Sequence, residues 1–129
     1  MYIADTGNKR IVVTDAEGQF LYQWGAFGSD PGQFNEPVSV AVDSDGTVAV
    51  GDTWNGRIQY FAMGGDNKIN PQPLNTWRIN GWQAQTYDDP YVAIRGTKVI
   101  ASVPKKNAIS LTGADGNESL RWGGNGADT

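Results

Sequence analysis

An internal repeat constrains the fold of this chain more than any other feature of its sequence. Residues 2–11 align without gaps on residues 49–58, and five of the ten positions are identical: Asp, Thr, Asn, Arg and Ile. Three tryptophans recur at a similar interval, because Trp24, Trp77 and Trp122 follow one another at 53 and 45 residues. A period near 50 residues indicates a repeat architecture, in which each unit buries its apolar surface against its neighbours.

The pattern inside each unit is that of short antiparallel strands. Apolar residues recur at every second position, and Gly, Pro, Asn and Asp interrupt them too often for helices. Glycine supplies the positive φ that tight hairpins need at Gly18, Gly46, Gly96 and Gly116. We expect eleven strands, at 2–4, 10–14, 20–24, 38–43, 47–51, 57–63, 76–79, 91–95, 98–102, 108–112 and 119–122. About four strands per unit is typical of a β-propeller blade.

Two segments carry a family resemblance. Residues 2–11, and the run from Gly32 to Gly46, resemble the NHL repeat, which is found in six-bladed β-propellers. The resemblance is close over residues 2–61 and weak over 62–129, where residues 103–109 replace the Asp-Thr-x-Asn-x-Arg-Ile run. It implies an all-β chain of about three four-stranded antiparallel blades, with Tyr2 in the second strand of the first blade.

The resemblance also divides the chain. Residues 1–129 should form a single partial propeller domain, with an incomplete blade at 1–25, a blade at 36–80 and a degenerate blade at 89–123. Propellers need roughly four to eight blades to close, so this segment should not form a ring by itself. We expect that it belongs to a longer propeller or that copies of it associate. An apolar blade face should be exposed at each end.

Composition narrows the classes of function. The chain has no Cys and no His, which removes thiolate chemistry and the commonest general base and metal ligand. The net charge of −4 argues against nucleic-acid binding, and no apolar run exceeds four residues, so we expect no membrane span. No cofactor and no metal are expected. The compartment is unknown from the residues, although similar repeats occur in large bacterial surface proteins, which makes the resemblance compatible with an extracytoplasmic location.

The repeated turn contains an acid and a base. Asp5 and Arg10, and likewise Asp52 and Arg57, flank four residues between two strands. They could clamp a substrate, but a feature repeated in each good unit is more simply explained as a structural pair that locks the hairpin. The Asp43–Gly46 run could hold calcium, but the further carboxylate that a calcium loop needs about seven residues on would be Asp52, which lies beyond a predicted strand. We therefore interpret the run as a hairpin turn.

Aromatic side chains outside the strands are the candidate binding residues. Trp54, Trp82 and Tyr87 fall in turns or irregular segments and could anchor a peptide or a sugar, or fold back onto their own loops. Lys68 lies in the loop at residues 64–73, which is longer than a hairpin requires and is either a recognition loop or a neutral insertion. Aromatics inside strands should fill the space between blades: Phe20, Trp24, Tyr60, Phe61, Trp77 and Trp122.

The sequence therefore predicts a non-catalytic binding or scaffold element of NHL type, not an enzyme. Its partner would be a protein, a polysaccharide or another copy of the chain. The alternative is a fragment of a propeller enzyme, lyase-like or hydrolase-like, whose metal or active channel lies mostly outside this segment.

Overall fold

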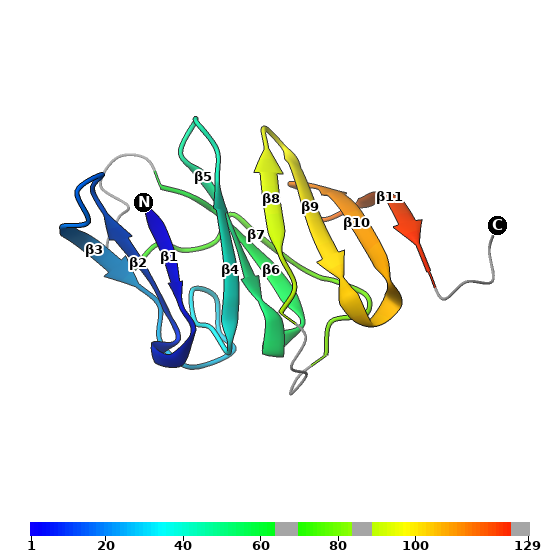
Figure 1. Ribbon diagram of the computed structural model, residues 1–129, viewed down its shortest axis with the longest axis horizontal. Coiled ribbons are helices and arrows are strands. Elements are labelled where there is room, and N and C mark those ends of the chain that lie inside the picture. The colour runs from blue at the N-terminus through cyan, green and yellow to red at the C-terminus, as the bar shows by residue number, and fades with distance from the viewer. Residues whose placement is uncertain (64–69, 84–88, 125–129) are drawn as a thin grey trace.

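The computed structural model describes residues 1–63, 70–83 and 89–124, and this part of the chain forms eleven strands in three antiparallel sheets (Figure 1). Each predicted strand lies within one residue of the observed one at either end. Sheet 1 contains β1 (Tyr2–Asp5), β2 (Arg10–Thr14) and β3 (Phe20–Trp24). Sheet 2 contains β4 (Pro37–Val42), β5 (Thr47–Asp52), β6 (Arg57–Ala62) and β7 (Asn75–Arg78). Sheet 3 contains β8 (Val92–Arg95), β9 (Lys98–Val103), β10 (Ala108–Gly113) and β11 (Glu118–Gly123).

One turn recurs at the same place in each sheet. Short 3-10 helices, η1 (Thr6–Asn8), η2 (Thr53–Asn55) and η3 (Pro104–Lys106), join β1 to β2, β5 to β6 and β9 to β10. Each is followed by a residue with left-handed backbone, which is Lys9, Gly56 and Asn107 in turn. The third unit thus keeps the backbone of the repeat although it has lost the Asp-Arg pair.

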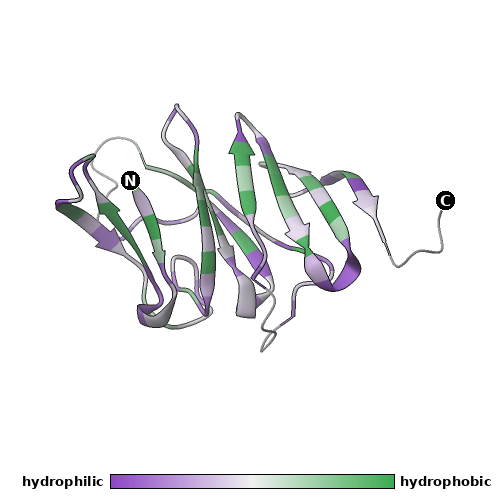
Figure 2. Ribbon diagram, in the orientation of Figure 1, coloured by the Kyte–Doolittle hydropathy of each residue, from purple (hydrophilic) through white to green (hydrophobic). Residues whose placement is uncertain are grey.

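The sheets stack face to face and bury two apolar clusters. Apolar and polar residues form bands along the strands in Figure 2, and successive residues of a strand point to opposite faces of the sheet. The cluster between sheets 1 and 2 includes Ile11, Trp24, Val50 and Phe61, and the ring centroids of Trp24 and Phe61 are 5.8 Å apart. A second cluster fills the space between sheets 2 and 3, and includes Ile58, Tyr60, Trp77, Val99, Ala101 and Val103. These clusters hold the sheets together as neighbouring blades.

The stack is open, and the fold is that of a propeller segment rather than a closed ring (Figure 1). Two aromatics that were expected in the core are exposed, one because of the open stack and the other because of a local irregularity in its strand. Trp122 is 47% exposed because it lies on the face of sheet 3 that no other sheet covers. Phe20 is 61% exposed at the start of β3, where its pairing with Thr14 follows a β-bulge. The predicted burial of these two residues was wrong.

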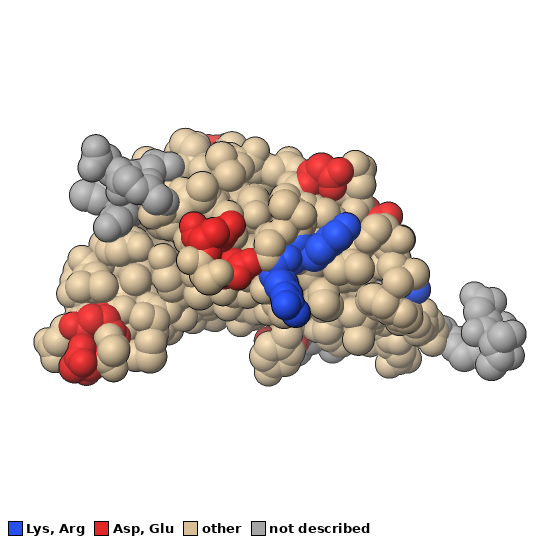
Figure 3. All heavy atoms as spheres, turned by 90° about the horizontal axis from the view of Figure 1, so that it is seen from above, with Lys and Arg blue, Asp and Glu red and all other residues tan. Residues whose placement is uncertain are grey.

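One rim of the molecule holds the tight hairpins at Gly18, Gly46, Gly96 and Gly116. It carries charges of both signs. Figure 3 shows this rim from above, with a large group of basic side chains, a small separate basic area at one edge, and several separate acidic groups. Within the described ranges, no helix is long and apolar enough to cross a membrane.

Candidate functional site

The opposite rim gathers the repeated turns and the connections between sheets. We define the turn rim as residues 6–9, 25–36, 53–56, 79–83 and 104–107, all of which leave the same ends of the strands (the lower edge in Figure 1). Because the strands alternate in direction, every second connection reaches this rim. The repeat therefore brings segments that are far apart in sequence to one edge of the molecule.

In sheet 1 the repeated turn is held by a partly exposed ion pair. Arg10 Nε donates to Asp5 Oδ2 at 2.8 Å, and Asn8 Nδ2 donates to both oxygens of the same carboxylate at 3.0 Å. Hydrogen bonds from Asn8 and then from Arg10 hold the pKa of Asp5 below its usual range. The carboxylate thus closes the hairpin between β1 and β2, and both of its oxygens already accept hydrogen bonds from this turn.

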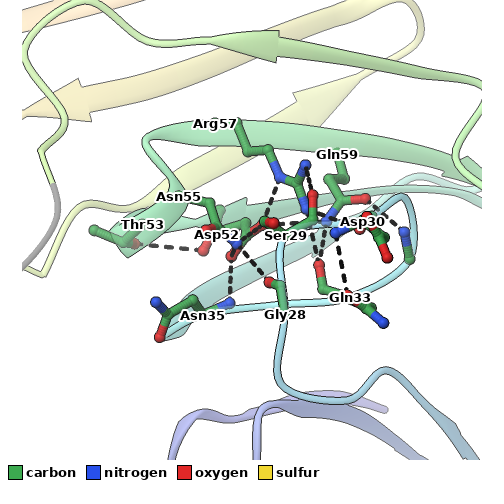
Figure 4. Close-up of polar contacts among 12 residues, drawn as sticks. Gly28, Ser29, Asp30, Gln33, Asn35, Asp52, Thr53, Asn55, Arg57 and Gln59 are labelled. Atoms are coloured by element: carbon green, nitrogen blue, oxygen red, sulfur yellow. Dashed lines mark hydrogen bonds and ion pairs between the residues drawn. The ribbon is translucent and has the colours of Figure 1, made fainter.

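In sheet 2 the equivalent carboxylate is a buried hub (Figure 4). Asp52 Oδ2 accepts from Arg57 Nε at 2.6 Å and from Gln59 Nε2 at 3.2 Å, and its oxygens also accept from Asn55 Nδ2. The backbone N–H of Asn35 donates to Oδ1 at 2.7 Å. Four donors from three separate segments therefore converge on one carboxylate that has no access to solvent.

The donors around Asp52 also bind the connection between sheets 1 and 2 (Figure 4). Arg57 donates to the carbonyl oxygens of Ser29, Asp30 and Gln33 at 2.7–3.0 Å. Gln59 accepts from the N–H of Gly32 at 2.9 Å and donates to the oxygen of Gln33 at 2.7 Å. The hub thus fixes the path of the chain from β3 to β4 against the turn between β5 and β6.

A further set of contacts joins the turns of neighbouring sheets. Thr6 Oγ1 donates to the oxygen of Pro37 at 2.8 Å, and the Lys9 ammonium pairs with Glu36. The N–H of Trp54 donates to the oxygen of Asn35 at 3.0 Å. The η1 turn of sheet 1 and the η2 turn of sheet 2 are therefore held to one intervening connection.

The predicted binding aromatics differ in their surroundings. Trp54 is half-buried in η2 on the turn rim. Trp82, for which the sequence left both an exposed and a folded-back position open, is buried between sheets 2 and 3, and its Nε1 donates to the oxygen of Ser102 at 2.8 Å. Its ring also lies where a side chain on Gly51 would stand. Lys68 and Tyr87 lie outside the described residues.

Several other acidic side chains of the described residues, in turns or strands, also accept hydrogen bonds from nearby groups. Asp45 accepts from the hydroxyl and the N–H of Thr47, which lowers its pKa, and Asp43 accepts from the N–H of Ser44 at 2.7 Å. This is the geometry of a hairpin turn. Glu118 accepts from Arg121 and Ser110, and these bonds lower its pKa. Over residues 1–63, 70–83 and 89–124, no three His, Cys, Asp or Glu side chains are grouped to hold a metal ion.

Two elements of the rim could not be found from sequence. Gln59 follows Arg57 by two residues, but its counterpart in the first unit is Val12, so the repeat gives no signal for it. The pair of Lys9 with Glu36 joins residues 27 positions apart, and no local spacing predicts it.

Comparison with known proteins identifies the repeat. Residues 34–61 match the family model of the NHL repeat. The human E3 ubiquitin-protein ligase TRIM32 is 54% identical over 46 residues, which are 36% of this chain and 7% of that protein. Human NHL repeat-containing protein 3 is 36% identical over 72 residues (47% of this chain, 21% of that protein). Peptidyl-glycine alpha-amidating monooxygenase B of Xenopus laevis is 44% identical over 59 residues (42% and 7%). The chain therefore spans a small fraction of these relatives.

A solved structure has a similar fold over nearly the whole chain. The crystal structure of a nidogen/laminin complex contains a chain that matches with a TM-score of 0.62 at 15% identity, covering 95% of this chain and 41% of that one. At this identity the match concerns the fold alone. With the three open sheets, it confirms the predicted β-propeller architecture.

Proposed function

We propose that this chain, an open segment of a β-propeller that carries an NHL repeat, is a non-catalytic scaffold that binds a protein through its turn rim. The observation that supports this most is the buried Asp52 hub, which holds residues 28–35 and the η2 turn in one arrangement. A rim that is already ordered loses little conformational entropy when a partner binds. Such a rim can therefore present side chains for recognition.

Trp54 is the side chain on this rim best suited to anchor a partner. The residue is only half-buried, and its backbone N–H is bound to the oxygen of Asn35. Tryptophan is enriched among the residues that dominate binding energy at protein interfaces. The equivalent position in sheet 1 is Gly7, so Trp54 is not required by the turn itself.

A protein partner is favoured over a polysaccharide. Sugar binding commonly uses several exposed aromatic faces, and Trp82, one of the three aromatics expected on loops, is buried. The similarity to a protein named as a ubiquitin-protein ligase also favours a protein as the class of partner.

A selection against a random-peptide phage library tests the proposal. The immobilised 129-residue chain should enrich peptides whose binding falls at least about tenfold with Trp54→Ala, the loss expected when an interface anchor is truncated. Leu74→Ala is the matched control, because Leu74 is an exposed apolar residue that does not lie on the turn rim. Circular dichroism should be the same for all three chains. Enriched peptides that bind equally well to the Trp54 variant, or no enrichment, would contradict the proposal, and binding on a glycan array instead would favour a polysaccharide partner.

The alternative of a propeller-enzyme fragment has one observation in its favour, the 44% identity to an amidating monooxygenase over 59 residues. It predicts that the purified chain retains a divalent ion, bound in the propeller channel by backbone carbonyls, Asp or Asn. The scaffold proposal predicts none, and elemental analysis distinguishes the two.

A further inference from the structure

The outer face of sheet 3 repeats a surface that is buried in the other two sheets. Ile109 pairs with Trp122 across β10 and β11, in the same register in which Ile58 pairs with Trp77 across β6 and β7. Ile58 and Trp77 are covered by sheet 3, whereas Ile109 and Trp122 are 45% and 47% exposed. Sheet 1 presents the same pair, Ile11 with Trp24, and it is covered by sheet 2.

This uncovered surface extends across all four strands of sheet 3. Ala93, Ile100, Leu111 and Leu120 are paired one to the next from β8 to β11. Their neighbours on the same strands, such as Val99 and Ala101, point to the opposite face and pack on sheet 2. The outer face of sheet 3 therefore carries an apolar row across its four strands, next to the exposed pair of Ile109 and Trp122.

The two filled interfaces show what kind of surface covers such a face. The pair Ile11 and Trp24 packs with Val48 and Val50 on β5, together with Phe61. The pair Ile58 and Trp77 packs with Val99 and Ala101 on β9. In each case the covering strand presents small or β-branched apolar residues at alternate positions.

The outer face of sheet 1 offers the same type of surface at the other end of the molecule. In the repeat that relates β1 to β5, Met1 and Ile3 stand at the positions of Val48 and Val50. Met1, Ile3 and Leu21 are all exposed, and Val12 lies between them opposite Ile3. No described part of the chain covers this face, because sheet 1 packs on sheet 2 through its other side.

We infer that the outer face of sheet 3 binds the outer face of sheet 1 of a second copy of this chain. The contact continues the order that the molecule already uses, in which one face of each sheet packs on the opposite face of the next. Two copies related by a two-fold axis form this head-to-tail contact twice and bring six sheets together. The inference rests on the end faces of the stack and not on the turn rim, so it stands apart from the proposed binding role.

Sedimentation equilibrium of the 129-residue chain at micromolar concentration tests the inference. The expected mass is twice the 13.9 kDa of one chain. Trp122→Asp and Ile3→Asp should each raise the dissociation constant of the dimer at least about 100-fold, because each substitution places an unpaired carboxylate in the buried contact. Leu74→Asp introduces the same charge at an exposed apolar position on neither end face and should leave the dimer intact. All three sites are exposed in the single chain, so circular dichroism should remain unchanged.

Mixing the two disruptive variants identifies the mode of contact. A chain with Trp122→Asp keeps an intact sheet 1 face, and a chain with Ile3→Asp keeps an intact sheet 3 face. An equimolar mixture should therefore form a heterodimer through one unaltered contact. A monomeric wild-type chain, a dimer that tolerates either substitution, or a mixture that stays monomeric would overturn the inference.

Discussion

At the scale of single residues, the same carboxylate has two different energetic roles in the two good repeats. Asp5 and Asp52 both accept a hydrogen bond from the Arg five residues later. The side chain of Asp5 is 27% exposed and that of Asp52 is fully buried. Removing a buried carboxylate takes from several donors an acceptor that water does not replace, whereas water replaces an exposed one.

Asp52→Ala should therefore lower the free energy of unfolding by about 3–5 kcal/mol, as expected for breaking a buried ion pair by deleting one partner. Asp5→Ala, the matched change in the first repeat, should have a much smaller effect because that pair is partly solvated. Urea denaturation of the two variants measures both. Equal losses would show that Asp52 is not a hub.

The phenol of Tyr22 gives a pH-dependent prediction. Burial, and then the hydrogen bond with the Tyr2 hydroxyl at 3.2 Å, raise the pKa of Tyr22 to about 12 from its ordinary value of 10.0. The folded state thus keeps a proton that the unfolded state loses, and stability should fall as the pH rises from about 10 towards 12. Absorbance at 295 nm should show one phenol titrating near pH 12, and Tyr22→Phe should remove it. A difference titration centred near pH 10 would contradict this environment.

Sequence reasoning found local partners but not burial that depends on other sheets. The Asp-Arg pairs could be predicted because five residues and one hairpin separate the two side chains. The burial of Trp82 could not be predicted, because it depends on Ser102 and on the apolar side chains of sheet 3. Trp122 occupies a position that is buried in the other units, but no sheet formed by the described residues covers it.

At the scale of elements, the recurring 3-10 turn fixes how each sheet is built. The turn carries a glycine at two different positions, Gly7 in the first repeat and Gly56 in the second, and the two differ in whether the backbone conformation needs glycine. Gly56 has φ +66°, and a Cβ there would lie 3.2 Å from the backbone oxygen of Trp82. Gly7 has no positive φ, a Cβ there would meet no heavy atom within 4 Å, and the second repeat carries Trp54 at that position.

Gly56→Ala should consequently lower the free energy of unfolding by about 1–2 kcal/mol, the usual cost of a left-handed L-residue. Gly7→Ala should leave it unchanged or raise it by about 0.4–1 kcal/mol by restricting the unfolded chain. Thermal and urea denaturation of the two variants provide the comparison. A stabilised Gly56 variant would refute the assigned turn geometry.

The strands themselves could be predicted closely because each is bounded by turn residues. Glycine at the tight hairpins, including Gly18 and Gly46, has the positive φ that the sequence indicated. Even the third unit, which lacks the Asp-Thr-x-Asn-x-Arg run, keeps the turn through Pro104–Lys106 and Asn107. Backbone geometry in this chain thus persists where the side-chain signature has gone.

At the scale of the whole molecule, three sheets hold together through the two apolar clusters between them. The turn rim, the hub at Asp52 and the exposed end faces all depend on this stacking, because each is defined by the position of one sheet against the next.

Nuclear Overhauser effects between side chains of different sheets test this stacking most directly. The indole protons of Trp24 on β3 should show cross-peaks to the ring of Phe61 on β6, since the centroids lie 5.8 Å apart. Trp77 on β7 should likewise show cross-peaks to methyl groups of the cluster that it shares with Val99 and Ala101. A well-dispersed spectrum with both sets of cross-peaks is the predicted result. A dispersed spectrum with cross-peaks within each sheet but none between sheets would contradict the stacked-blade architecture.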